Sequence, residues 1–541
     1  MTIVTPLAPW IAEISLSSRR RSAVLLALFA AGAWIQWING PFVRSVAMDN
    51  QIYYYIADQV AAGVPPHVSL LDHKHALSAM LSGWTMAAGR VIGVDDIVSM
   101  RVLSMVATAT VAPALWLIAY GVTRNAVVAH VAALTALGFD DFYSQGAAGV
   151  RPQVFMAVFM VQAFLALHAS RFALAGAAAM AAFLCWQPAL IVCGAMAAAL
   201  AIGTVALRKL SRFSFGASSV LLLYESYFAF IGALGPQIFQ SYLLRANLTG
   251  HVSAPLWDSF TFIVRDGRWG LGWRIAIPLT FLAVLFSIAV AAVLRPAAMW
   301  RAARRDAVVT SLVVAASLAT AFTLFEHQAC PDRFFLQPFI ALASGVVWGA
   351  AIAWALFRSS GRHALSLAMV LFWIGTLVST VFAESYHPRR SDHTLADQRD
   401  LAQRTRRLHD EYGFIGAVGC PHMLALAGLE NYDPVGLVID PRVREYLAAT
   451  GGEEGYRPTP KPMPAVLLTS RGGEAEAFPW LRKEYWPVPD AAYQAQGIRV
   501  WLRKECLVER KKCLALFECE ATSACRMLGH ALPAAAASKG G

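Results

Sequence analysis

The chain has 541 residues, of which 57% are hydrophobic and only 15% are charged, and its mean hydropathy is +0.51. These values exclude a soluble globular protein of this length and indicate an integral membrane protein. The formal net charge of +11 does not indicate nucleic-acid binding, because the arginines gather in short loops between apolar runs.

Apolar runs long enough to cross a hydrocarbon core of about 30 Å recur along the first 383 residues. We therefore expect a polytopic α-helical membrane domain over residues 1–383 with about eleven transmembrane helices. The expected spans lie near residues 23–40, 100–120, 126–139, 153–169, 173–186, 189–207, 216–235, 273–294, 306–325, 334–357 and 364–383.

The basic residues predict how the chain is oriented. With the N-terminus in the cytoplasm, every basic cluster falls on the cytoplasmic side, as the positive-inside rule requires; the clusters lie at 19–21, 124, 171, 208–212, 295–305 and 358–362. The first apolar segment has no convincing small-x-small cleavage site, so we expect an uncleaved span. An odd number of spans then places residues 384–541 in the periplasm of a multi-pass protein of the bacterial inner membrane.

Residues 384–541 predict a second, soluble domain, because charge, Pro and Gly rise and no run could span a bilayer. A basic helical stretch, "DQRDLAQRTRRLHDEYG", comes first. Strand-like "FIGAVG", helix-like "CPHMLALAGL" and the strand-like segments "PAVLLTS" and "GIRVWLRK" follow. This alternation is typical of a small α/β domain. It has no phosphate-binding glycine loop, so nucleotide binding is not expected.

Six of the eight cysteines fall on the expected external side, where disulfides persist; they are Cys330, Cys420, Cys506, Cys513, Cys519 and Cys525. The last four are spaced unlike the paired C-x-x-C of zinc sites. We therefore predict a disulfide-linked tail whose connectivity stays open.

The first external loop, about 41–98, is long and contains two helix-like segments, at 50–62 and 75–92. Each carries an apolar stripe with a polar opposite face, which predicts amphipathic helices lying along the membrane surface. The first stripe consists of Ile52, Ile56 and Val60, and the second of Leu77, Met80, Leu81 and Trp84.

Between these segments, the run Asp72-His73-Lys74-His75 puts an acid, two imidazoles and an ammonium group at the bilayer surface. A lysine is a good point charge for phosphate, and a lipid phosphate would lie at this depth. The alternative is that Lys74 extends to the lipid headgroups and its neighbours are only solvated.

Three further external loops carry ionisable groups, at 138–153, 235–273 and 325–335. Singly, each is typical of a solvated loop charge; together they predict the wall of a substrate cavity. The candidates are Asp140, Asp141, Arg151, His251, Glu326, His327, Asp332 and Arg333. A divalent metal held by His251 and His327 with Glu326 or Asp72 stays open, although no tight ligand spacing supports it, and no cofactor is firmly predicted.

The order of several segments carries a family resemblance. The segments are "MDNQIYYYIADQVAAGVPP", "LLDHKHALSAMLSG", "RVLSMVATATVAPALWLIAY", "GVRPQVFMAVFMVQAFLAL", "AAFLCWQPALIV" and "RFFLQPFIALASG". Over about residues 20–380 the chain resembles polytopic glycosyltransferases of the GT-C superfamily, in particular the bacterial branch related to protein O-mannosyltransferases and the lipid A aminoarabinose transferase.

The resemblance implies transfer of a sugar from a polyprenyl-phosphate donor to a lipid, polysaccharide or protein acceptor on the outer face, normally with inversion. It implies that Asp49, the acid after the first span, is the base or orienter for the acceptor hydroxyl. It also implies that His73 and Lys74 form the His-Lys pair of the first loop, with Lys74 near the donor phosphate. Arg333 corresponds to a second phosphate-binding residue, and Arg151 is a further candidate. The chain reads "HKHAL" where the family usually has His-Lys-Pro-Pro.

Alternative interpretations stay open at this stage. Asp49 could cap the following helix, an interaction typically worth about 1 kcal/mol. Tyr53, Tyr54 and Tyr55 fit an interfacial aromatic belt as well as a sugar platform. The whole chain could instead be a transporter or flippase, which predicts charges near the bilayer midplane in broken helices. It could also be a non-catalytic partner subunit of a membrane complex.

Overall fold

The computed structural model describes residues 16–46, 49–202, 206–244, 276–325, 332–358, 367, 371, 394–412, 415–431, 464–470 and 479–504. The chain forms two compact units. Unit 1 comprises Met1–Phe42, Lys74–Gln237 and Thr249–Arg390, and unit 2 comprises Val43–His73, Ile238–Leu248 and Ser391–Gly541. The loop expected to be external, about residues 41–98, is thus divided between the units, with Asp49 in unit 2 and Lys74 at the start of a segment of unit 1.

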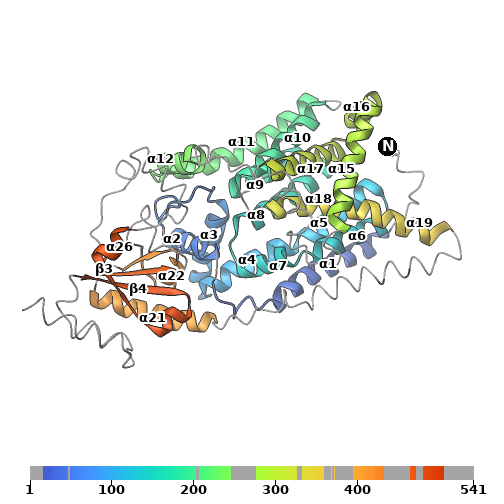
Figure 1. The fold of residues 1–541 in the computed structure, drawn as a ribbon. Coiled ribbons are helices and arrows are strands. Elements are labelled where there is room, and N and C mark those ends of the chain that lie inside the picture. Colours follow the sequence, from blue (N-terminus) through green and yellow to red (C-terminus); the bar gives the residue numbers. More distant parts are fainter. Residues whose placement is uncertain are drawn as a thin grey trace, which may run out of the picture. The chain divides into compact units, whose positions relative to one another are not determined.

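Unit 1 is helical (Figure 1). Its helices are α1 (Ser18–Ile38), α3 (Leu77–Val91), α4 (Asp96–Ala109), α5 (Val111–Thr123), α6 (Ala126–Leu137), α7 (Asp140–Ala148), α8 (Pro152–His168), α9 (Phe172–Cys185), η2 (Gln187–Ala189), α10 (Leu190–Ile202), α11 (Ala206–Phe230), α15 (Ala276–Leu294), α16 (Pro296–Arg305), α17 (Ala307–Phe325), α18 (Asp332–Ser344), η5 (Gly345–Gly349) and α19 (Ala350–Arg358). The short helix α12 (Leu234–Ile238) ends at the boundary with unit 2.

Five helices of the described residues are long and apolar enough to cross a membrane, or six if the bent pair α6 and α7 counts as one span. They are Ser18–Ile38, Asp96–Thr123, Ile277–Leu294, Ala307–Leu324 and Phe334–Ala355. Pro152–His168, Phe172–Cys185 and Gln187–Ile202 are apolar but shorter. The membrane-protein class is supported, while the predicted count of eleven, which includes a span at 364–383 mostly outside the described residues, stays a prediction.

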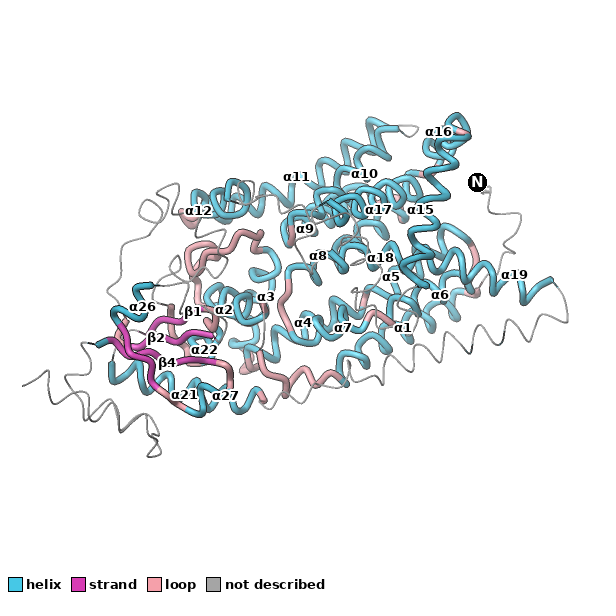
Figure 2. Tube along the Cα trace, viewed as in Figure 1, coloured by secondary structure: helices cyan, strands magenta, loops and turns pink. Residues whose placement is uncertain are grey.

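The close packing of α9 against α11 depends on glycine (Figure 2). A Cβ atom at Gly176 of α9 would lie 1.9 Å from the Phe213 carbonyl oxygen, and one at Gly216 of α11 would lie 1.8 Å from the Ala173 carbonyl oxygen. Small residues let helix backbones approach in this way, which is how membrane helices gain packing energy in the absence of a hydrophobic driving force.

In unit 2, the described residues form a mixed sheet of order β1-β2-β4-β3. Its strands are β1 (Ile415–Val418), β2 (Val466–Ser470), β3 (Tyr485–Val488) and β4 (Ile498–Arg503). Strands β1 and β2 are parallel, and the other two pairings are antiparallel. The helical elements are α2 (Asn50–Ala61), η3 (Phe239–Leu244), α21 (Leu395–Tyr412), α22 (His422–Leu426), α26 (Pro479–Glu484) and α27 (Ala491–Ala495). Helix α21 packs on β1 and α22, and α27 packs on β4 (Figure 2).

The sequence correctly located three of these strands and the helices α21 and α22. Strand β3 was not predicted, because Pro487 interrupts the segment "YWPV". Strand β3 lies at the edge of the described sheet. A proline is tolerated in an edge strand because the backbone N–H groups on its outer side make no hydrogen bonds within the sheet.

The expectation that residues 50–62 form a surface helix with one polar face is wrong in part. Helix α2 forms as predicted, but nine of its twelve residues are buried, among them the polar Asp58 and Gln59. Within unit 2 it packs on α22, and Tyr53, Tyr54 and Tyr55 are all buried. The three tyrosines therefore do not form an exposed interfacial belt. Sequence periodicity could not reveal this, because the partners lie almost 400 residues away.

The predicted disulfide framework stays a prediction. Cys420 is buried with its thiol 3.7 Å from the Val418 carbonyl oxygen, and the other five external cysteines lie outside the described residues.

Candidate functional site

Asp49, the predicted base, lies immediately before the first helical residue of α2 and is exposed. Its backbone carbonyl accepts hydrogen bonds from the amides of Ile52 and Tyr53, at 3.1 and 3.4 Å. Within the described first turn of α2, however, its side chain accepts no capping hydrogen bond. Capping therefore does not explain the carboxylate.

The run 72–75 is half-buried until its last member. Asp72, His73 and Lys74 are of intermediate exposure. His75 is buried in unit 1, where its ring centroid lies 4.7 Å from that of Phe183 and 6.0 Å from that of Tyr224. The Tyr224 hydroxyl accepts a hydrogen bond from the Ala76 amide at 3.0 Å. These contacts fix the backbone just before α3. Lys74 therefore directly precedes a residue that is anchored in the core of unit 1.

A buried arginine fixes the second external loop in unit 1. Arg101 of α4 has no exposed surface; its guanidinium donates hydrogen bonds to the carbonyl oxygens of Ala148, at 3.2 Å, and Pro41. Ser104 donates to the Gly149 carbonyl oxygen at 3.1 Å. Since Gly149 has a φ of +119°, this turn needs glycine. The exit of α1 and the end of α7 are thereby tied to one helix.

Two of the predicted cavity residues, Asp141 and Arg151, flank this turn and are buried. Asp141 lies in the first turn of α7, where a carboxylate is favoured by the helix dipole. The Arg151 guanidinium lies 5.8 Å from the centroid of the Phe334 ring, a cation–π contact with α18. The structure therefore brings the second and last of the predicted loops together at Arg151 and the start of α18.

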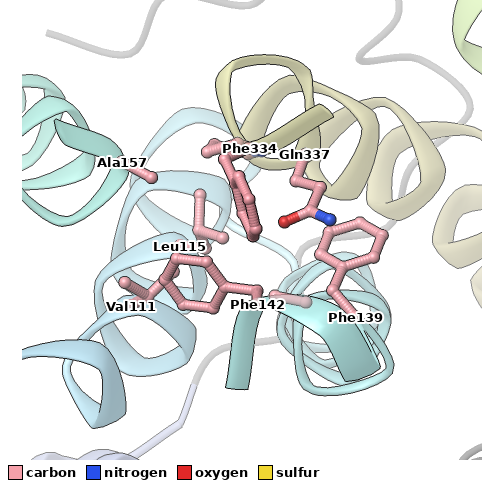
Figure 3. A pocket seen from close by; sticks show the side chains of 9 residues that line it. Val111, Leu115, Phe139, Phe142, Ala157, Phe334 and Gln337 are labelled. Atoms are coloured by element: carbon pink, nitrogen blue, oxygen red, sulfur yellow. The ribbon is translucent and has the colours of Figure 1, made fainter. Parts of the chain in front are cut away.

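A small apolar cavity lies beneath this contact (Figure 3). Its volume for a water-sized sphere is about 10 Å³, and its lining residues are Val111, Leu115, Ala136, Phe139, Phe142, Ala157, Phe334, Gln337 and Pro338. The Gln337 carboxamide points among the phenyl rings, and neither of its polar atoms has a hydrogen-bond partner among the described residues. The cavity is large enough for one water molecule, which would satisfy that amide, and is too small for a sugar.

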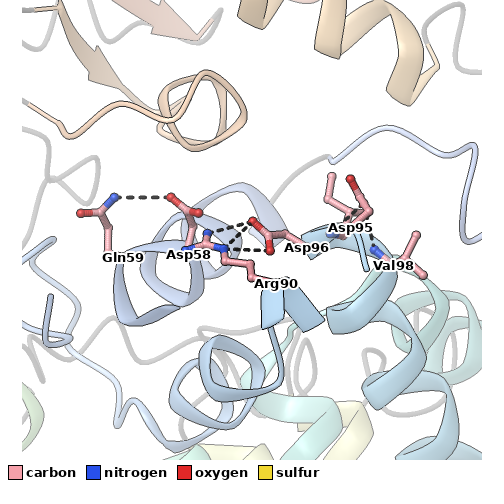
Figure 4. A network of polar contacts seen from close by, with 7 residues as sticks. Asp58, Gln59, Arg90, Asp95, Asp96 and Val98 are labelled. Carbon is pink, nitrogen blue, oxygen red and sulfur yellow. Dashed lines mark hydrogen bonds and ion pairs between the residues drawn. The ribbon is translucent and has the colours of Figure 1, made fainter. Parts of the chain in front are cut away.

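Other carboxylates have structural partners. The Arg90 guanidinium donates to both carboxylate oxygens of Asp96, with a shortest distance of 2.8 Å (Figure 4). Asp95 accepts hydrogen bonds from the amides of Ile97 and Val98 and caps α4. These two acids secure the turn between α3 and α4.

The remaining predicted residues lie wholly or partly outside the described structure. The side chains of Asp140 and Arg333 are not described, and neither are His251, Glu326 and His327. Among the described residues no group of three His, Cys, Asp or Glu could hold a metal. The metal hypothesis involved three of the undescribed residues and stays open.

No family model matches the chain. Curated protein sequences likewise include no match to it.

Solved structures do match. ArnT from Cupriavidus metallidurans bound to undecaprenyl phosphate is 13% identical, with a TM-score of 0.59 over 90% of this chain and 98% of that chain. The apo state of the same protein, also 13% identical, gives 0.56 over 89% and 98%. The Archaeoglobus fulgidus oligosaccharyltransferase in its apo form is 13% identical and gives 0.53 over 76% of this chain and 64% of that chain. These proteins belong to the GT-C superfamily.

The chain has the GT-C fold. The resemblance predicted from the sequence is confirmed for the fold, and the structural neighbours are glycosyltransferases of the GT-C type.

Sequence reasoning missed several residues that hold the loops of this GT-C fold. Arg101 could have been noticed as a charge inside an apolar run, which is costly unless it is hydrogen-bonded. Gln240, Gln398 and Asn431 gave no local signal, because a lone carboxamide in a polar segment is common. Their importance comes from burial and from hydrogen bonds to residues far away in the sequence.

Proposed function

We propose that the chain is a glycosyltransferase that moves a sugar from a polyprenyl-phosphate donor to an envelope lipid, polysaccharide or protein acceptor on the periplasmic face of the bacterial inner membrane. The observation that carries the proposal is the fold match over 98% of ArnT, a protein solved with undecaprenyl phosphate bound. Residues 1–383 supply the membrane domain, with the N-terminus in the cytoplasm, and residues 384–541 belong to the periplasmic part.

The proposed chemistry is a displacement at the anomeric carbon. The acceptor hydroxyl oxygen attacks this carbon, and its bond to the phosphate oxygen breaks with the electron pair, so that polyprenyl phosphate leaves and the configuration inverts. Asp49 takes the hydroxyl proton, for which an exposed carboxylate is suited.

Cations balance the charge that grows on the leaving phosphate. Lys74 has this role, with Arg333 and Arg151 as further phosphate-binding residues. The buried position of Arg151 supports its proposed role, because the attraction between a guanidinium and a phosphate is stronger in a medium of low dielectric constant. We keep as proposed cavity residues Tyr53, Asp72, His73, His75, Asp140, Asp141, His251, Glu326 and His327.

The test is transfer of radiolabelled sugar from a panel of polyprenyl-phosphate sugars into membrane lipid, glycan and protein fractions. We expect wild-type protein to label one fraction and Asp49→Asn protein to lose about 10²-fold or more of the rate, since general-base catalysis contributes that much. Asp410→Asn is the matched control, because Asp410 is an exposed acid of unit 2 whose ion pairs among the described residues are with side chains of its own helix, Arg406 and His409. Full activity of Asp49→Asn protein would refute the assigned base.

One observation favours a second candidate, a transporter or flippase. Helices α6 and α7 meet at an angle of 57°, and discontinuous helices are typical of transporters. Reconstituted vesicles separate the two functions: a transporter moves labelled lipid-linked sugar between leaflets without transfer. The third hypothesis, a partner subunit, predicts a co-purifying second polypeptide and no transfer by the chain alone.

A further inference from the structure

The loop segment 43–73 belongs to unit 2, together with residues 238–248 and the C-terminal residues 391–541. The loop segment contains Asp49 near its beginning and Asp72 and His73 at its end. Three buried residues of the same unit bind it at three places: Gln240 and Gln398 through their side-chain carboxamides, and Asn431 through its backbone N–H.

Gln398 of α21 binds the backbone three residues before Asp49. The Val46 amide donates to Gln398 Oε1 at 2.8 Å, and Gln398 Nε2 donates to the Val46 carbonyl oxygen at 3.0 Å. The Leu395 amide also donates to the Val43 carbonyl oxygen at 2.9 Å. The Gln398 carboxamide thus both accepts from and donates to the backbone of one residue, as the backbone of a neighbouring strand does. The chain that leads into α2 cannot shift along α21 without losing these buried hydrogen bonds.

Asn431 binds α2 six residues after Asp49. Its side chain exchanges two hydrogen bonds with the backbone of Ala417 in β1, at 3.0 and 3.1 Å. The backbone N–H of Asn431 donates to the Tyr55 hydroxyl at 2.8 Å. Tyr55 is buried, and burial raises the pKa of its hydroxyl, so it stays neutral and accepts this bond. Helix α2 is thus attached to the sheet.

Gln240 of η3 binds the loop that leads to Lys74. Its Oε1 accepts hydrogen bonds from the Asp72 amide and His67 Nδ1, both at 3.0 Å, and its Nε2 donates to the His67 carbonyl oxygen at 2.8 Å. His67 has a φ of +64°, a left-handed conformation that a histidine rarely adopts. Contacts that compensate this strain hold the turn in one conformation.

We propose that Gln398, Asn431 and Gln240 are positioning residues for the transfer reaction, and that the C-terminal part of unit 2 serves to fix Asp49 and the loop ending at Lys74. The inference rests on the proposed function and goes beyond it by giving the C-terminal domain a role. A general base acts only within hydrogen-bond reach of the acceptor hydroxyl, and an error of about 1 Å can cost on the order of 10²-fold in rate.

The three residues are expected to affect different steps of the reaction. Gln398 and Asn431 act on the carboxylate that receives the proton, whereas Gln240 acts on the segment that binds the phosphate. Loss of Gln398 therefore lowers kcat and leaves donor KM and undecaprenyl phosphate affinity unchanged. Loss of Gln240 weakens the binding of undecaprenyl phosphate. A merely structural role would reduce the amount of folded enzyme and produce neither pattern.

The experiment uses full-length protein in lipid nanodiscs. Hydrogen exchange measured by mass spectrometry should rise on the order of tenfold in residues 50–61 of Gln398→Ala protein, because one set of buried hydrogen bonds is lost. Gln403→Ala, at an exposed position of the same helix, is the matched control and should exchange as wild type does. Should Gln398→Ala fold poorly, Tyr55→Phe removes only the acceptor of the Asn431 bond and should also raise exchange in α2.

Kinetics complete the test. Gln398→Ala should lose about 10- to 100-fold in kcat, and Gln240→Ala should lose affinity for undecaprenyl phosphate with kcat at saturating donor retained. Unchanged exchange in α2 and unchanged kcat in Gln398→Ala protein, with active wild type, would overturn the positioning role alone. Wild-type protein that neither transfers sugar from any donor nor binds undecaprenyl phosphate would overturn the proposed function and, with it, this role.

Discussion

His67 makes the stability of unit 2 depend on pH. Burial lowers its pKa from the ordinary 6.5 to about 4, although the Gln240 side chain and a backbone bond with Asp72 oppose the shift. In the unfolded chain His67 takes a proton as the pH falls below about 6.5, but in the folded chain it does so only near 4. The stabilisation is therefore complete above pH 6.5 and declines as the pH falls towards 4, by about 3 kcal/mol in all.

We expect the unfolding temperature of the wild type to fall more between pH 7.5 and 4.5 than that of His67→Asn protein. Asparagine tolerates the positive φ at this position, so the variant removes the titrating group while keeping the turn. His422, whose pKa is lowered to about 3 by burial, shifts both proteins in the same direction and cancels in the comparison. Equal losses in the two proteins would show that His67 does not carry the effect.

The contact between α9 and α11 allows a test at the scale of the helices. Alanine at Gly176 would place a methyl group 1.9 Å from a backbone carbonyl oxygen, which cannot move as a side chain can. We expect Gly176→Ala to destabilise unit 1 by about 3 kcal/mol or more, as severe overpacking does. Gly194→Ala in α10 meets no atom within 4 Å and should change stability by less than about 1 kcal/mol. Thermal unfolding in one detergent compares them; similar unfolding temperatures would mean that α9 and α11 separate readily.

The elements differ in how much the sequence could predict. Helices α2 and α3 were found at nearly their observed bounds, because apolar periodicity is a local signal. The burial of α2 on all sides could not be predicted in this way, because Tyr55 of this helix contacts Asn431, which is distant in the sequence. Strand β3 was missed because Pro487 weakens a local signal that pairing with β4 overrides. Asp49 and the run 72–75 stay predicted site residues, proposed from their order along the chain, whereas the contacts of Gln240, Gln398 and Asn431 with this loop depend on tertiary structure.

At the scale of the whole molecule, the proposed reaction draws on both units. Unit 1 contains the helices that are apolar enough to cross a membrane, together with the proposed phosphate-binding residues Lys74 and Arg151. Unit 2 contains the proposed base, Asp49. The chain enters unit 2 between α1 and α3, again at η3 and finally at α21. Unit 2 is therefore built from three separate segments of the chain, because residues 43–73 and 238–248 fold together with the C-terminal residues.

The orientation of the chain in the membrane can be tested with reporters. Helix α16 lies between two apolar helices and has no buried residue; its arginines, with Arg295 before it, are exposed. Moving four such charges across a bilayer is costly, so the positive-inside rule predicts that they stay in the cytoplasm. We expect green fluorescent protein fused after Arg305 to fluoresce and alkaline phosphatase there to be inactive. Because an odd number of spans is predicted, the same reporters fused after Gly541 should give the opposite result. Fluorescence at both positions would place residues 384–541 in the cytoplasm, where a periplasmic transfer reaction could not use Asp49.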